Sequence, residues 1–211
     1  MIADTMPSLL EQIDRALSDG KLRADAAQNI RKILSGDARD FAARVIDELS
    51  QANEWEELND RFYKTLAFGT GGLRGRTIGK VVTKAERGTP NALGRPEFPC
   101  LGTNAMNYFN VARATRGLVS YVRKWRSKNA STGRAKIVIA HDTRHFSKEF
   151  AQVAAKTAAA CGCDAVVFDG PRSTPELSFA VRYRNLRIIL QYELNMTRPF
   201  VVIQSKHIPW L

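Results

Sequence analysis

Two short apolar runs, separated by a helical pattern, constrain the fold of this chain more than any other feature of its sequence. Residues 136–140 (Lys-Ile-Val-Ile-Ala) and 164–168 (Asp-Ala-Val-Val-Phe) have the length and β-branched content of buried strands. Apolar residues recur at helical spacing over residues 150–158, Gly162 is a predicted stop, and a second helical pattern surrounds Leu177. Alternating strands and helices predict an α/β domain with a mainly parallel sheet.

Polar residues follow both predicted strands. In parallel sheets, ligands gather at the carboxyl ends of the strands. Four residues occupy these positions: Asp142, Arg144, Arg172 and Ser173. We therefore expect a binding edge there, although an ion pair from Arg144 to Asp142 or Glu149 would explain Arg144 equally well. Ser147 is predicted to cap the helix that follows.

The first 60 residues are predicted to be helical. Apolar residues recur every three or four positions in four segments, at residues 9–17, 26–34, 41–49 and 55–66. Asp37 is a predicted cap of the third helix. Each segment has a polar face, so the helices should pack on one another or on the following domain. We interpret them as a helical extension without chemistry of its own.

A glycine-rich segment follows at residues 68–75, which read Phe-Gly-Thr-Gly-Gly-Leu-Arg-Gly. Its glycines disfavour a helix, since each costs about 1 kcal/mol relative to alanine. The backbone of Thr70, Gly71 and Gly72 could approach an anion closely, and Arg74 adds a planar guanidinium suited to phosphate or carboxylate. The segment predicts an anion-binding loop, although it matches neither a Walker loop nor a dinucleotide fingerprint.

The next stretch, residues 83–103, is rich in Gly, Pro, Asn and Arg and is predicted to form a long exposed loop. Asn104 or Asn107 can then cap an amphipathic helix that runs to Trp125. We assign the basic residues of this helix to a solvated face: Arg113, Arg116, Arg123 and Lys124.

The chain carries 32 basic and 21 acidic residues, a net charge of +11. A basic surface of this kind could bind along the phosphates of a nucleic acid, or the positive charge could accompany the binding of a small phosphorylated ligand. Because no zinc finger, RNP or basic-zipper pattern is present, we do not expect nucleic acid as a partner. A non-catalytic basic module that binds nucleic acid or acidic partners is the alternative interpretation.

Several sequence features together predict a cytoplasmic protein without a membrane partner. No apolar run approaches the roughly 20 residues of a membrane span. The N-terminal Met-Ile-Ala-Asp lacks the regions of a signal peptide. Three cysteines and three histidines show no spacing typical of a metal site, so we expect free thiols and no metal ligands.

Four segments, taken together and in order, resemble the α-D-phosphohexomutases, the family of phosphoglucomutase and phosphomannomutase. They are residues 68–75, 111–118 (Val-Ala-Arg-Ala-Thr-Arg-Gly-Leu), 140–147 (Ala-His-Asp-Thr-Arg-His-Phe-Ser) and 173–181 (Ser-Thr-Pro-Glu-Leu-Ser-Phe-Ala-Val). The resemblance covers roughly residues 40–182. The helical residues before Phe68 look like the longer, phosphopentomutase-like branch of the family.

The resemblance implies the three-layer α/β/α first domain of a four-domain enzyme, here at residues 61–183 after a helical extension at residues 1–60. Such enzymes move a phosphoryl group between two hydroxyls of a hexose or pentose phosphate, through a sugar bisphosphate, with a phosphoserine and Mg²⁺. By resemblance, Arg74 contacts phosphate near the serine, and Asp142 and Arg144 support the active-site loop. Sugar phosphates and sugar bisphosphates are therefore the expected partners.

The C-terminal residues depart from the family pattern. The family's phosphoserine lies in a Thr-Ala-Ser-His-Asn-Pro loop, and the corresponding residues 191–197 contain no serine. Ser205 is the remaining phosphoserine candidate, although its spacing differs and Lys206 separates it from His207. The acidic Asp-Gly-Asp-Gly-Asp-Arg loop that holds Mg²⁺ in the family is absent from this sequence.

These departures predict that residues 184–211 are a divergent or frameshifted tail. We therefore expect the N-terminal domain of a phosphohexomutase-like enzyme, truncated before or within its serine loop and inactive alone. If the tail is native instead, its apolar runs at residues 188–190 and 200–203 could pair as strands.

Overall fold

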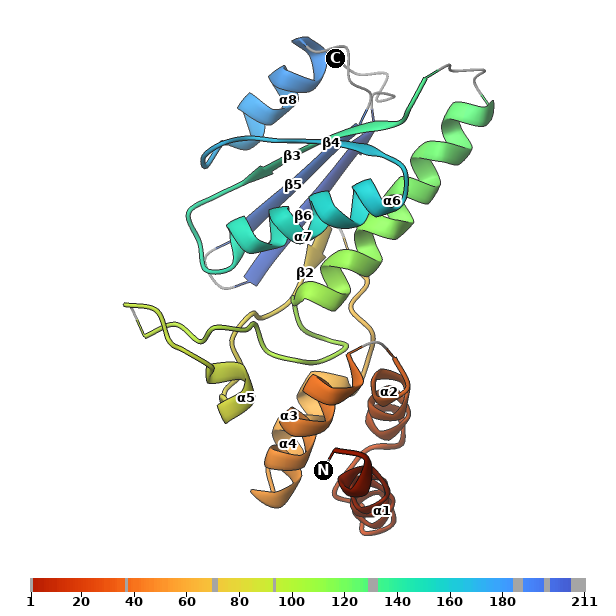
Figure 1. Cartoon of the computed structure of the whole chain (residues 1–211), viewed down its shortest axis with the longest axis vertical. Helices are drawn as coiled ribbons and strands as arrows, with labels where there is room; N and C mark the ends of the chain where they lie inside the picture. The colour runs from red at the N-terminus through yellow and green to blue at the C-terminus, as the bar shows by residue number, and fades with distance from the viewer. Residues whose placement is uncertain are drawn as a thin grey trace. The chain divides into compact units, whose positions relative to one another are not determined.

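The computed structural model describes residues 2–36, 38–69, 72–92, 94–128, 133–183, 188–195 and 198–205. The chain forms two compact units (Figure 1): a helical unit of residues 1–66 and 76–106, and an α/β unit of residues 67–75 and 107–211. The chain therefore passes from one unit to the other after residues 66, 75 and 106.

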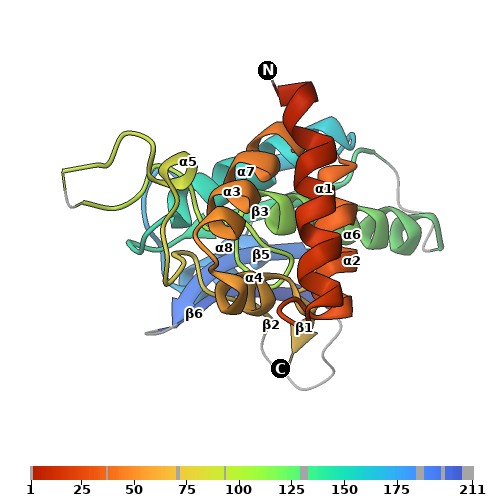
Figure 2. The same ribbon diagram turned by 90° about the horizontal axis from the view of Figure 1, so that it is seen from below.

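The helical unit contains the predicted N-terminal helices: α1 (Ile2–Ser18), α2 (Ala24–Leu34), α3 (Arg39–Gln51) and α4 (Trp55–Phe62). Figure 2 shows these helices packed against one another. Their apolar faces share one core that includes Leu9, Ile13, Leu22, Ile30, Val45, Ile46, Leu49, Leu58 and Phe62. The predicted cap Asp37 lies outside the described residues, and α3 begins after Ala38 without a side-chain cap.

Residues 76–106 complete the helical unit, and here the prediction of a long exposed loop is wrong in part. Thr83, Glu86 and Cys100 are buried, and Leu101 joins the core of the four helices. A short helix, α5 (Lys84–Arg87), begins at Thr83, whose side chain accepts from the Glu86 N–H while the Glu86 carboxylate accepts from the Thr83 N–H. The composition indicated a loop correctly, but it could not show that the base of the loop is buried.

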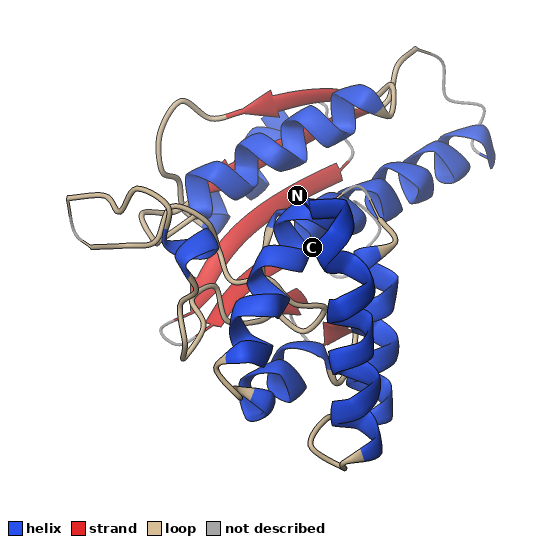
Figure 3. Cartoon of the chain, turned by 60° about the horizontal axis from the view of Figure 1, so that its bottom comes forward, coloured by secondary structure: helices blue, strands red, loops and turns tan. Residues whose placement is uncertain are grey.

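Among the described residues, the α/β unit is built on a six-stranded sheet in the order β1-β2-β6-β5-β3-β4. The strands, red in Figure 3, are β1 (Phe68–Gly69), β2 (Gly72–Arg74), β3 (Lys136–His141), β4 (Asp164–Val167), β5 (Ile188–Asn195) and β6 (Arg198–Ser205). Strand β3 is parallel to β4 and to β5. Strand β6 is antiparallel to β5 and β2, and β1 is antiparallel to β2.

In the described part of the unit, the helices that accompany this sheet are α6 (Tyr108–Lys128), α7 (Ser147–Ala160) and α8 (Thr174–Tyr183). Because β4 and β5 flank β3 on opposite sides, right-handed crossovers place α7 and α8 on opposite faces of the sheet (Figure 1). Val138 and Ala140 pack with Leu177 of α8, so the alternate residues Ile137 and Ile139 face the α7 side. This is the α/β/α fold expected from the sequence, preceded by a helical N-terminus.

Strands β5 and β6 come from the segment that we expected to be a divergent or frameshifted tail. Their apolar runs pair with each other, with Leu190 opposite Ile203, and β5 also pairs with β3. This is the strand pairing that the sequence allowed in the case of a native tail. Residues 206–211 lie outside the described residues.

Candidate functional site

The glycine-rich segment forms a strand pair rather than the loop predicted from its composition. Gly69 pairs with Gly72 across the β1–β2 hairpin, which leaves only Thr70 and Gly71 between the paired residues. Thr70 and Gly71, two of the predicted phosphate-binding residues, lie outside the described residues. Arg74 ends β2, where it pairs with Phe200 of β6, and its side chain is exposed.

The strand register brings Arg74 to the same edge of the sheet as Asp142. One row of paired residues crosses four strands: Leu73 of β2, Val201 of β6, Tyr192 of β5 and His141 of β3. Strands β2, β5 and β3 run in the same direction, so Arg74 and Asp142 each lie one residue beyond this row, at the carboxyl edge. Three strand spacings separate the two residues, about 14 Å.

Asp142 organises the turn after β3. Its carboxylate accepts a hydrogen bond from the Arg144 N–H at 3.1 Å and forms an ion pair with the Arg144 guanidinium at 3.5 Å. The Asp142 N–H donates to the Ser147 hydroxyl at 3.1 Å. The ion pair between Arg144 and Asp142 that we considered from the sequence is therefore present, and it lies within the turn after β3.

The predicted cap at Ser147 is wrong. The N-cap of α7 is Phe146, in a left-handed conformation with a φ of 67°, and Ser147 is buried inside the first turn. The Phe146 ring is fully buried, and its centroid lies 6.0 Å from the centroid of the Phe150 ring. Burying a large aromatic side chain is favourable enough to offset the one to three kcal/mol, roughly, of a strained backbone. Asn107, by contrast, caps α6 as predicted, since its side-chain oxygen accepts from the Asn110 N–H.

The loop after β4 folds over the end of β3. The Arg172 N–H donates to the His141 carbonyl at 2.9 Å. The Arg172 guanidinium forms ion pairs at 3.0 Å with both Asp169 and Glu176 and lies over the Phe168 ring. Arg172 thus joins the carboxyl ends of β3 and β4, next to the exposed Ser173.

Ser205, the phosphoserine candidate, is not brought to this edge. It pairs with Ile188 at the amino end of β5, four residues along β6 from the row that contains His141. Four residues of strand correspond to about 13 Å. Ser205 therefore lies at the opposite edge of the sheet from Arg74, Asp142 and Arg144.

The acidic side chains in the turns after β3 and β4 are engaged by arginines. Asp142 and Asp169 are paired with Arg144 and Arg172. Within the part of the chain that the structure describes, no group of three or more His, Cys, Asp or Glu side chains could hold a metal. Among the same residues, no helix is long and apolar enough to cross a membrane.

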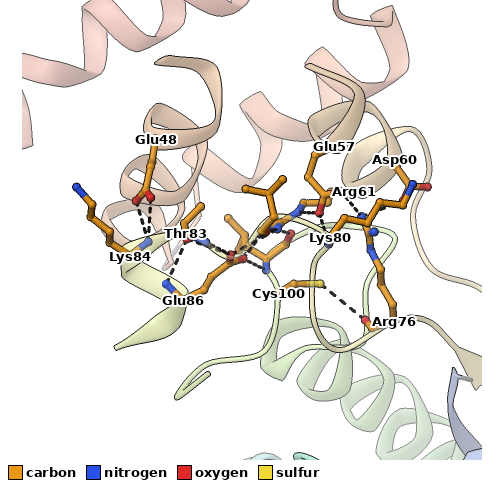
Figure 4. Close-up of polar contacts among 12 residues, drawn as sticks. Glu48, Glu57, Asp60, Arg61, Arg76, Lys80, Thr83, Lys84, Glu86 and Cys100 are labelled. Atoms are coloured by element: carbon orange, nitrogen blue, oxygen red, sulfur yellow. Dashed lines mark hydrogen bonds and ion pairs between the residues drawn. The ribbon is translucent and has the colours of Figure 1, made fainter. Parts of the chain in front are cut away.

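The densest electrostatic cluster lies in the helical unit (Figure 4). Arg61 of α4 is fully buried and contacts Glu57 at 2.7 Å and Glu86 at 2.6 Å. It also donates to the carbonyl of Val81. The other oxygen of Glu57 lies 3.0 Å from Arg76, in an ion pair rather than an aligned hydrogen bond.

This cluster shifts the pKa values of its members. Burial alone would raise the pKa of Glu57, but the hydrogen bond and charge of Arg61, with the charge of Arg76, outweigh burial and lower it. Burial alone would lower the pKa of Arg61, and chiefly the charge of Glu86 raises it instead. Burial raises the pKa of the Cys100 thiol to about 12, so this cysteine is chemically inert at neutral pH.

This cluster could not be predicted from the sequence, because its members lie between residues 57 and 101 and share no motif. The only available signal was the helical spacing of Glu57 and Arg61, which is common on solvated helix surfaces. His141 was also missed as part of the edge: it is buried, and its Nδ1 lies 3.0 Å from the Asp142 carbonyl.

Comparison with known proteins places this fold in a family. The sequence model described as phosphoglucomutase/phosphomannomutase, alpha/beta/alpha domain I, matches residues 100–207, about half of the chain. The chain belongs to the phosphoglucomutase/phosphomannomutase family, and the match covers its domain I. The match reaches past Val181, where the motifs in the sequence end, and includes β5 and β6.

Similar curated proteins carry the name phosphoglucomutase. The protein of Staphylococcus epidermidis is 34% identical over 128 residues, which cover 61% of this chain and 18% of that protein. That of Staphylococcus saprophyticus is 33% identical over 139 residues, 66% of this chain and 20% of that protein. That of Staphylococcus aureus (strain bovine RF122) is 35% identical over 129 residues. The similar stretch thus spans about a fifth of these relatives' length.

Proposed function

We propose that the carboxyl edge of the sheet is the phosphate-binding side of a phosphohexomutase first domain. The observation that carries this proposal is the register row from Leu73 to His141, because it aligns Arg74 with the turn of Asp142 and Arg144. Arg74 is the proposed phosphate contact, together with the backbone of residues 70–72, which the sequence suggested for the same role. Asp142 and Arg144 hold the neighbouring turn.

The proposed substrates are hexose or pentose phosphates and their bisphosphates, the molecules on which the family acts. The α/β unit suits anionic ligands, since it contains 18 basic and 6 acidic residues. The described cysteines are thiols and not disulfides, in keeping with a proposed cytoplasmic location. The alternative of a basic module for nucleic acid has no support from the family or its relatives.

Magnesium, which the family uses, does not fit the residues of this chain. The acidic side chains Asp142 and Asp169 in the turns after β3 and β4 are already paired with arginines, and the family's acidic loop is absent from the sequence. We therefore derive no catalytic step through a metal ion. What the chain itself offers is a cationic edge that would bind and orient a phosphate group.

Binding of glucose 6-phosphate or sulfate to Arg74→Ala tests the site. Calorimetry should show a loss of about 1.5–3 kcal/mol, the range for a hydrogen bond to a charged group. Arg134→Ala is the matched control: it removes the same charge from the exposed residue before β3, at the opposite edge. Equal affinity in Arg74→Ala and the wild type would refute the site.

We further propose that this chain has no mutase activity by itself. Phosphoryl transfer in the family needs a nucleophile and metal carboxylates acting as a unit, and the effects of such residues are grossly non-additive. Assays of the purified protein with Mg²⁺ and a glucose bisphosphate should show no turnover. Phosphorylation of Ser205 after this incubation, found by mass spectrometry, would overturn the proposal.

The origin of residues 184–211 has a separate test. If the tail is frameshifted, the nucleotide sequence after codon 182, translated in one of the other two frames, should encode a Thr-Ala-Ser-His-Asn-Pro loop. If neither frame encodes such a loop, the tail is native.

A further inference from the structure

Strand β4 lies at one end of the sheet of the α/β unit. Among the described residues, β3 is the strand that pairs with it, in parallel. The Asp164 N–H donates to the Ala135 carbonyl at 2.8 Å, and the Phe168 N–H donates to a carbonyl of β3 at 3.2 Å. Because a parallel ladder uses alternate residues of a strand, Ala165 and Val167 direct their N–H and C=O groups away from β3. Strand β4 therefore presents two donors and two acceptors at the edge of the sheet.

The side chains of this edge are apolar and exposed. Val166 is 46% exposed and Val167 is 39% exposed. Val166 lies beside Val138 of β3, on the face where α8 packs over β3 and β5, and Val167 lies on the opposite face. Soluble proteins commonly place a charge or a proline on an edge strand, which prevents pairing with another strand. Residues 165–168 contain neither, so the sequence of β4 does not oppose the addition of a further strand.

An antiparallel second copy of β4 satisfies the outward backbone groups of both strands. When Val166 lies opposite Val166 of the second copy, each Ala165 lies opposite a Val167. These outward-facing residues then form two hydrogen-bonded pairs, with four N–H to C=O bonds in total. The arrangement has two-fold symmetry and uses the β4 edge of both copies, so it closes at two chains.

The amino end of β4 carries a net positive charge. Asp164 begins the strand and pairs at 3.3 Å with Arg134, whose side chain is 67% exposed. Lys136 of β3 is in register with Asp164 and is also exposed. These two cations and one carboxylate sum to a charge of +1.

The carboxyl end of β4 carries the opposite charge. Arg172 lies over the Phe168 ring, just after the strand, and forms ion pairs at 3.0 Å with Asp169 and Glu176. This cation and two carboxylates sum to −1. In an antiparallel pair, the amino end of each β4 lies beside the carboxyl end of the other, so opposite charges meet at both ends. The charges therefore favour a second copy in the antiparallel orientation.

We propose that the β4 edge is the contact surface between two copies of this chain, which pair antiparallel about Val166. The two sheets then form one continuous sheet. Because β4 has four residues, the contact is small, and small interfaces bind weakly. We expect a dissociation constant between about 1 µM and 1 mM. Below about 1 µM the chain is monomeric and Val166 is exposed. This dimer does not depend on the proposed phosphate site.

Sedimentation velocity of the full chain, from about 1 µM to 1 mM, measures the dimer. Val166→Lys places two like charges opposite each other at the centre of the pair and should raise the dissociation constant about fivefold or more. Tyr121→Lys is the matched control, since it adds the same charge at an exposed apolar residue of α6 and should leave the constant unchanged. Circular dichroism checks that both variants fold.

Two outcomes of this experiment would overturn the proposal. One is a chain that stays monomeric up to about 1 mM. Protection of the β4 amides from hydrogen exchange in that monomer would show that another part of the chain covers the edge. The other is an equal dissociation constant in Val166→Lys and Tyr121→Lys, which would place the dimer contact on a different surface.

Cysteine cross-linking tests the register, and it also serves if Val166→Lys does not fold. Directly opposite Cβ atoms of an antiparallel pair lie about 4.5–5.5 Å apart, close to the separation of a disulfide. Val166→Cys should therefore form a covalent dimer when copper and air oxidise the thiols. Val167→Cys is the control, because it lies opposite Ala165 and should not cross-link to itself, and the wild type accounts for Cys161. Equal cross-linking in all three proteins would overturn the proposed pairing.

Discussion

The helical and α/β units differ in their balance of basic and acidic residues. The helical unit contains 14 basic and 15 acidic residues, whereas the α/β unit contains 18 basic and 6 acidic residues. The whole positive excess of the chain therefore belongs to the unit that carries Arg74. Net charge is a property of the α/β surface and favours encounters with anions. In the helical unit, basic and acidic residues are nearly equal in number, and some of the charged side chains form buried ion pairs.

The two units also differ in whether their buried side chains carry charge. Among the described residues, the buried charged side chains are Glu57, Arg61 and Glu86, all of them in the helical unit. In the part of the α/β unit whose burial is described, Ile137 and Ile139 are fully buried, and the buried polar residues are uncharged or histidine. The helical unit thus combines its apolar core with matched buried ionic partners, whereas the described interior of the α/β unit has apolar packing without buried ion pairs. The following predictions separate these two kinds of stability.

Arg61→Met should produce the largest effect. It leaves Glu57 and Glu86 buried without their main partner, which costs about 3–5 kcal/mol of unfolding free energy. Urea denaturation measures this loss. Arg44→Met, at an exposed position on α3, is the control and should change the unfolding free energy by about 0.5 kcal/mol or less. A loss below about 1 kcal/mol in Arg61→Met would mean that the cluster is not what stabilises this unit.

Acid should destabilise the helical unit through Glu57. The folded-state pKa of this residue is below its ordinary value of 4.5, so its stabilisation is present above pH 4.5 and is lost as the pH falls through the lowered pKa. The unfolding free energy of the wild type should therefore fall more steeply below pH 4.5 than that of Glu57→Gln. Parallel pH profiles for the two proteins would contradict the assignment.

Ile139→Val should have a moderate effect on the α/β unit. Removing one buried methylene costs about 0.5–1.5 kcal/mol. Val166→Ala removes more carbon, but from a residue of the edge strand β4 that is 46% exposed, and should cost less. Denaturation monitored in the α/β unit by hydrogen exchange provides the comparison. A larger loss in Val166→Ala would show that β4 is covered in solution.

Arg144→Gln should have the smallest effect on stability. The Arg144 side chain is 40% exposed, and exposed ion pairs contribute about 0–1 kcal/mol. Arg134→Gln, which loses a similar exposed ion pair with Asp164, should behave alike in thermal unfolding. A much larger loss of stability in Arg144→Gln than in Arg134→Gln would show that Arg144 stabilises more of the fold than the turn after β3.

Most elements of the fold were predictable because periodicity is local. The spacing of Leu9, Ile13 and Leu17 identified a helix, and the run from Ile137 to Ala140 identified a strand, without knowledge of any partner. The proposed anion site was predictable only as separate parts. Arg74 and Asp142 are 68 residues apart in sequence, and their shared edge depends on the pairing of β2, β6, β5 and β3.

The sequence by itself determined the helical N-terminus, the α/β class and the residues that resemble the phosphohexomutases, because these depend on short-range pattern and residue type. Tertiary structure alone decided that the glycine-rich segment is a hairpin, that Ser205 lies at the far edge, and that Glu57, Arg61, Arg76 and Glu86 meet. The physical reason is that strand register and ion pairing join residues distant in sequence. The one-letter sequence does not distinguish a buried charged residue from a solvated one, because only tertiary packing removes the water around it.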